Sequence, residues 1–247
     1  MRFEKAKGPA TKERLSGGTC ESALLGRITY ALVLFMVLSF SIRVVGTLFP
    51  AVFHYGYTVE LTIVINTAFS ILHLLFYLFF LKEYAAGRPQ SLKVGTSLAI
   101  VGSLLVAFIY VKNIDLVFHL DLIPSAWMSR YYDAVVPIVA SCFILIFFIV
   151  FRKALLPEER EDLAWATASA LVGVGIFLIL HMVVLVNFLK FKKFLWLEHM
   201  PRAVAVGTVP LVIIAASCLL LFYFKFCRYL SVTGGKTEKI MGSDSTL

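Results

Sequence analysis

The sequence predicts an all-α, polytopic membrane protein: a bundle of six transmembrane helices with short loops and disordered tails. Of its 247 residues, 60% are hydrophobic and only 15% are charged, whereas about 25% are charged in a typical soluble domain. The chain therefore lacks the polar residues needed to cover a water-facing surface. The lipid bilayer is the partner that this composition predicts. The basic residues are spread over many loops, so the net charge of +8 does not indicate nucleic-acid binding.

Six apolar segments are long enough to span a membrane, because about 20 helical residues cross roughly 30 Å of hydrocarbon. Backbone groups inside a bilayer must bond to one another, so each segment is expected to be a helix. The predicted spans are 23–49, 58–81, 92–111, 131–151, 163–189 and 202–224. The remaining ends, 1–22 and 225–247, are polar and are predicted to be tails without a packed core.

The distribution of Lys and Arg predicts which way the chain crosses the membrane. The side with both tails and the second and fourth loops carries 16 of these residues, and the opposite side carries six. Basic loops remain in the cytoplasm, so both termini are expected there, with the chain in the cell (inner) membrane. The basic run at 190–193, on the opposite side, argues against this orientation.

Charged residues lie near the outer ends of three predicted spans. They are Arg43, Glu60 and Asp133. Charges within a membrane are costly and are often functional, so these residues are a candidate substrate, ion or proton site in which Arg43 pairs with Glu60 or Asp133. The favoured alternative is an ion pair that holds two helices together, or side chains that reach the membrane interface.

Two histidines, His73 and His181, lie inside predicted spans. Counting about 1.5 Å per residue separates them by roughly 12 Å in depth, which disfavours a haem bridging them. A histidine bonded to a helix carbonyl, Ser or Thr is the favoured interpretation. The four cysteines have no metal-binding spacing. The sequence therefore predicts no cofactor and no metal.

Residues 113–122, between the third and fourth spans, alternate apolar with polar residues. This period of two predicts an extended segment with one face on the membrane. A short helix would instead align Asp115 with His119, four residues apart. Asp115, His119 and Asp121 form a candidate metal or proton-relay site, but the pattern is weak, and a solvated surface segment is favoured.

Small residues mark faces where helices can approach closely. Gly95 and Gly102 share one face of the third span, and Ala166, Ala170 and Gly173 follow one another along the fifth. The sequence leaves open whether these faces pack within the chain or form a homo-oligomer.

Two functional hypotheses remain nearly equal. No hydrolase elbow, zinc-protease or phosphate-loop motif is present, so no enzyme is predicted. The first hypothesis is a small transporter or channel-like protein for an ion or small solute, supported by three-plus-three spans. The second is a non-catalytic membrane-embedded subunit or scaffold of a larger complex, supported by the scarcity of charge at mid-membrane. A haem- or quinone-binding respiratory subunit ranks below both.

Overall fold

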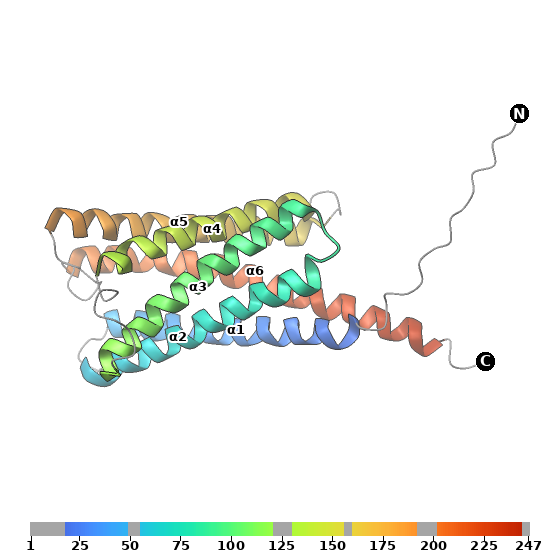
Figure 1. The fold of residues 1–247 in the computed structure, drawn as a ribbon, viewed down its shortest axis with the longest axis horizontal. Coiled ribbons are helices and arrows are strands. Elements are labelled where there is room, and N and C mark those ends of the chain that lie inside the picture. The colour runs from blue at the N-terminus through green and yellow to red at the C-terminus, as the bar shows by residue number, and fades with distance from the viewer. Residues whose placement is uncertain (1–17, 49–54, 121–129, 156–159, 192–201, 244–247) are drawn as a thin grey trace, which may run out of the picture.

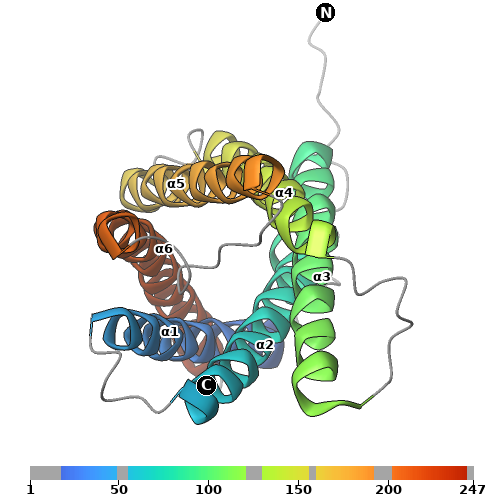
Figure 2. The same cartoon turned by 90° about the vertical axis from the view of Figure 1, so that its left-hand side faces the viewer.

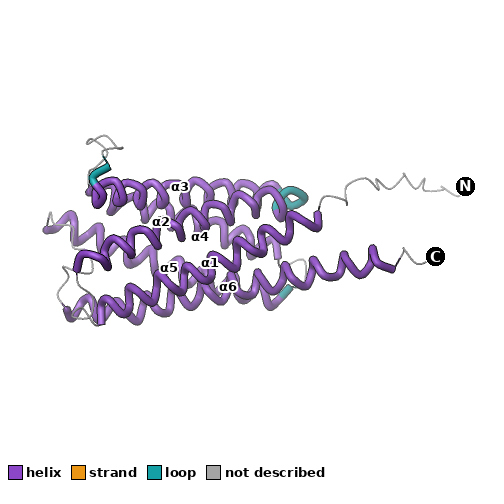
Figure 3. Tube along the Cα trace, turned by 90° about the horizontal axis from the view of Figure 1, so that it is seen from below, coloured by secondary structure: helices purple, strands orange, loops and turns teal. Residues whose placement is uncertain are grey.

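The structure, a computed structural model, describes residues 18–48, 55–120, 130–155, 160–191 and 202–243. Nearly all of these residues are helical, as Figure 3 shows, and none of them forms a strand, which confirms the all-α prediction. Each of the six α-helices contains a stretch that is long and apolar enough to cross a membrane. The helices are α1 (Gly18–Leu48), α2 (Tyr55–Phe79), α3 (Gln90–Phe118), α4 (Arg130–Leu155), α5 (Glu161–Phe191) and α6 (Arg202–Ser243).

The six helices form a closed ring. Each helix contacts the next along the chain, and α6 contacts α1. The even number of helices brings the start of α1 and the end of α6 to one end of the bundle (Figure 1), which we name the terminal end. Figure 2 views the ring from the opposite, distal end, with α1 and α2 facing α4 and α5. Side chains from all six helices therefore point towards one shared interior.

α3 is longer than the sequence predicts. It continues to Phe118, so the extended segment predicted from residue 113 onwards is wrong for residues 113–118. Lys112 and Asp115 in this part are only 1% and 2% exposed, so burial against the bundle outweighs the period-two pattern. The helix ends at His119, which has a left-handed φ of 50° and donates its backbone N–H to the Asp115 carbonyl.

α6 is also longer than predicted. The sequence predicts a tail from residue 225, but the helix runs on to Ser243 and projects beyond the bundle in Figure 1. Its first extra turn is part of the packed interior, because Phe226 is fully buried. Of the predicted N-terminal tail, residues 18–22 belong to α1, and residues 1–17 lie outside the described part.

The small residues pack helices within this chain. A methyl group on Gly102 would lie 3.1 Å from the Ala140 carbonyl oxygen of α4, and one on Gly173 would lie 2.6 Å from the Ala215 carbonyl oxygen of α6. Glycine is needed at Gly173 in particular, since no Cβ atom fits at that distance. The sequence left open whether these faces pack within the chain or form a homo-oligomer. In the structure they pack within the chain and hold α3 to α4 and α5 to α6.

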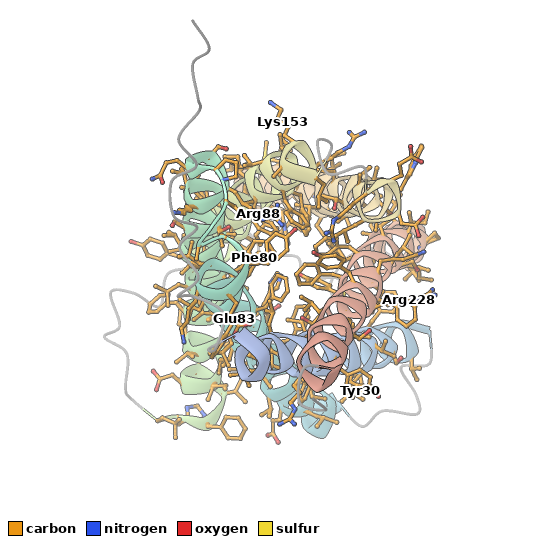
Figure 4. All side chains as sticks on the ribbon, turned by 90° about the vertical axis from the view of Figure 1, so that its right-hand side faces the viewer. Tyr30, Phe80, Glu83, Arg88, Lys153 and Arg228 are labelled. Carbon is orange, nitrogen blue, oxygen red and sulfur yellow. The ribbon has the colours of Figure 1, made fainter. Side chains whose placement is uncertain are left out.

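Aromatic rings fill the terminal half of the interior. They come from α2, α4, α6 and η1 (Phe80–Tyr84), a π-helical turn that continues α2 and is closed by a 2.9 Å bond from Ala85 N to Phe80 O. Many ring pairs meet edge to face, at centroid distances such as 4.9 Å for Phe148 and Phe222. In Figure 4, seen from the terminal end, Phe80 lies inside the ring of helices. We name this set the aromatic cluster: Phe76, Tyr77, Phe80, Tyr84, Phe147, Phe148, Phe151, Phe222, Tyr223 and Phe226.

Candidate functional site: a cavity in the distal half

A cavity of about 360 Å³ occupies the interior between the aromatic cluster and the distal end. All six helices contribute to its wall, which is mainly apolar. Phe148 of the aromatic cluster lies at its boundary, so the cluster forms the floor of the cavity. The polar residues of the wall are Ser39, Asn66, His73, Tyr110, Asp133, Ser141, His181 and Thr208.

Several polar wall residues bond across a helix boundary. The Ser39 hydroxyl of α1 donates to Oδ1 of Asn66 on α2, at 2.5 Å. On the opposite wall, the Ser141 hydroxyl of α4 lies 3.3 Å from Nδ1 of His181 on α5. Hydrogen bonds between neighbouring helices restrict the side chains that make them, so these wall groups are held in place before a ligand arrives.

His73 lies at the floor of the cavity. Its Nε2 atom is 2.5 Å from the Tyr223 hydroxyl of α6, and its ring packs against Phe69 at a centroid distance of 5.6 Å and Tyr77 at 4.9 Å. His181, further towards the distal end, stacks on Phe177. Both histidines that the sequence places in apolar spans therefore face one cavity.

Asp133 has a partner that the sequence did not suggest. Nζ of Lys112 on α3 donates to its carboxylate, and the two side chains are only 2% and 10% exposed. The sequence assigns Lys112 to a loop because the predicted third span ends at residue 111, whereas α3 carries Lys112 into the interior. The pair neutralises both charges in surroundings where an isolated charge would be strongly unfavourable.

Of the other two members of the predicted charged group, the structure describes the side chain of Glu60 only. Glu60 is half-buried near the beginning of α2 and is not among the described wall residues. Arg43 belongs to α1, but its side chain lies outside the described part of the chain. The proposed pairing of Arg43 with Glu60 or Asp133 stays a prediction.

The candidate loop site is divided by the end of α3. Asp115 is buried within the bundle, His119 is exposed, and Asp121 lies outside the described residues. Among the residues that the structure describes, no group of three or more His, Cys, Asp or Glu side chains is placed to hold a metal. A metal or proton-relay role for these three residues stays a prediction.

Sequence reasoning missed Asn66, although a signal was available. An amide in the middle of an apolar span is unusual, and Asn66 lies seven residues before His73, on the same face of α2. The partners Ser39 and Tyr223 carry no such signal, because their contacts depend on which helices become neighbours in the ring.

No protein-family model matches the sequence, and no curated protein or solved structure matches it. The wall of the cavity combines apolar surface with a few fixed hydrogen-bonding groups, which is the usual composition of a small-molecule site.

Proposed function

We propose that the chain is an integral membrane protein, a small transporter that binds an uncharged solute in the cavity. Its helices are long and apolar enough to span a bilayer, and they carry exposed apolar side chains such as Ile179 at 63% and Phe224 at 61%. Lipid is the solvent that suits such a surface. The observation that carries the proposal is the cavity lined by residues of all six helices.

The charge of the wall supports an uncharged solute over an ion. Asp133 is the charged member of the described wall, and Lys112 already neutralises it. The other polar wall residues offer hydroxyl, amide and imidazole groups. An ion that entered without a counter-charge would lose its hydration at a cost of several kcal/mol. An uncharged solute would lose much less hydration free energy on entering the cavity.

The aromatic cluster supports transport rather than an open channel. It fills the ring at the terminal end, so a solute in the cavity has closed packing beneath it. A central site that is closed on one side is the arrangement that alternating access requires. With the excess of basic residues placed in the cytoplasm, the floor of the cavity would face inwards.

Two neighbouring residues of α6 provide a matched test. Val212 lines the cavity, whereas Ile213 is 40% exposed on the outside of the bundle. We expect Val212→Phe to fill the cavity and Ile213→Phe to leave it open. Thermal stabilisation of purified protein by a panel of uncharged solutes, from glycerol and urea to alkylated ring compounds, measures binding. Uptake into proteoliposomes measures transport of the polar members.

The proposal requires at least one solute to stabilise the wild type and Ile213→Phe but not Val212→Phe. A monovalent-ion flux that Val212→Phe abolishes would instead make the cavity an ion path. If no solute distinguishes the variants and the wild type purifies with a constant set of membrane proteins, the chain is a non-catalytic subunit of that complex.

A further inference from the structure

One face of α2 presents a regular series of side chains to the cavity. Asn66, Phe69 and His73 are spaced by three and four residues, so they lie one above another on the helix, and all three line the cavity. We name them the α2 stripe. Its two polar members lie on either side of one aromatic ring.

Each polar member of the α2 stripe is fixed by another helix and retains hydrogen-bonding capacity. The Ser39 hydroxyl donates a hydrogen bond to Oδ1 of Asn66. The amide nitrogen of Asn66 has no hydrogen-bond partner among the described residues. Tyr223 occupies Nε2 of His73, and Nδ1 of His73 likewise has no hydrogen-bond partner among the described residues. An amide nitrogen is a donor, and Nδ1 is a donor in one tautomer of imidazole.

The spacing of these two groups limits the size of a ligand that can bond to both. Seven helical residues correspond to about 10.5 Å along the axis of α2. For a ligand that lies along the α2 stripe between these two side chains, two hydrogen bonds of about 2.9 Å each leave roughly 5 Å between its acceptor atoms. This is the width of a single six-membered ring that carries an oxygen at each of two opposite positions.

The surroundings of the α2 stripe suit the faces of such a ring. Phe69 lies between the two polar groups, and Phe177 and Ile144 belong to the facing walls from α5 and α4. Aromatic and aliphatic side chains bury a flat ring favourably, through both area and stacking. The neutralised Lys112–Asp133 pair leaves no charge that the ring would have to match.

We propose that the solute is a flat, uncharged ring with hydrogen-bond acceptors on two opposite edges, the p-quinone being the simplest member of this class. Asn66 and His73 each donate to one carbonyl oxygen, and Phe69 contacts the ring face. The ring is bound and released unchanged, without a redox step. This inference rests on the proposed function, since it assigns the solute of the same cavity.

The test is equilibrium binding to the full chain in detergent, using a tritiated p-benzoquinone with a decyl tail and methyl groups on the other three ring carbons. An unsubstituted ring carbon would react covalently with thiols such as that of Cys142. We expect saturable binding that Asn66→Leu weakens about fivefold, since a hydrogen bond contributes about 1 kcal/mol. Thr67→Val is the matched control: Thr67 is the next residue of α2, is buried, bonds to the Ile63 carbonyl and does not line the cavity. It should bind as the wild type does.

A second measurement needs no variant. The same alkylated ring with methyl groups in place of both carbonyl oxygens keeps the shape and loses both acceptors, so it should compete for the wild-type site about 25-fold more weakly than the quinone. Equal competition by this analogue, or unchanged binding by a folded Asn66→Leu, would overturn the inference. If Asn66→Leu does not fold, the analogue alone decides.

The inference can fail while the proposed function stands. In that case the quinone does not bind, but another uncharged solute stabilises the wild type and does not stabilise Val212→Phe. If Val212→Phe changes the response to no solute at all, the cavity is not a binding site and both proposals fall.

Discussion

The two halves of the bundle are built from the same helices, but one is solid and the other is hollow. On α4, the inward positions of the terminal half are Phe147 and Phe151, whereas those of the distal half include Ala140 and Ser141. α6 changes in the same way, from Phe222 at the terminal end to Val212 near the distal end. A cavity here follows from the size of the inward side chains and not from loosely packed helices.

The largest effect that we expect comes from breaking the ion pair of the hollow half. Lys112→Met leaves the Asp133 carboxylate buried without its partner, so the free energy of unfolding should fall by about 3–5 kcal/mol. Lys112→Met combined with Asp133→Leu removes both charges and should recover most of this loss. Denaturation in mixed detergent measures both. A double variant no more stable than the single one would mean that the pair acts through packing and not charge.

The next effect compares an aromatic residue from each half. Phe80 is fully buried in the aromatic cluster and meets rings from α2, α4 and α6. Phe80→Ala should therefore lower the unfolding free energy by about 3 kcal/mol. Phe177 borders the cavity, where one side already lacks packing partners, so Phe177→Ala should cost about 1 kcal/mol. Equal losses in the same denaturation experiment would argue against the difference between the two halves.

The last effect concerns the wall of the hollow half. Gly173→Ala places a methyl group 2.6 Å from the Ala215 carbonyl oxygen, so α5 and α6 must separate. We expect a loss of about 1–3 kcal/mol, seen as a lower thermal unfolding midpoint. Gly175→Ala is its control, because nothing lies within 4 Å of a methyl group there. This control should be neutral or slightly stabilising, since alanine favours helix. Similar midpoints for the two variants would mean that the wall yields easily.

The sequence was informative about the helices and much less so about their interior. Apolar length alone located all six helices, because it depends only on local composition. The end of α3 was misjudged, since burial of Lys112 and Asp115 depends on α4 and other neighbours that a local pattern does not contain. Asp133, His73 and His181 were singled out as polar residues in apolar spans, and all three face the cavity. Their partners Lys112, Tyr223 and Ser141 become apparent only in the ring.

The π-helical turn at Phe80–Tyr84 ends the helix that α2 begins, so it sets the direction in which the chain leaves that helix. One such turn holds an additional residue, equivalent to a single insertion, and each residue of an α-helix advances by about 100° around the axis. Ala85 is thereby turned into the interior, where it is fully buried, and the chain leaves towards the start of α3 at Gln90. Shortening this segment by one residue would rotate that exit by about a quarter of a circle and misdirect the connection to α3.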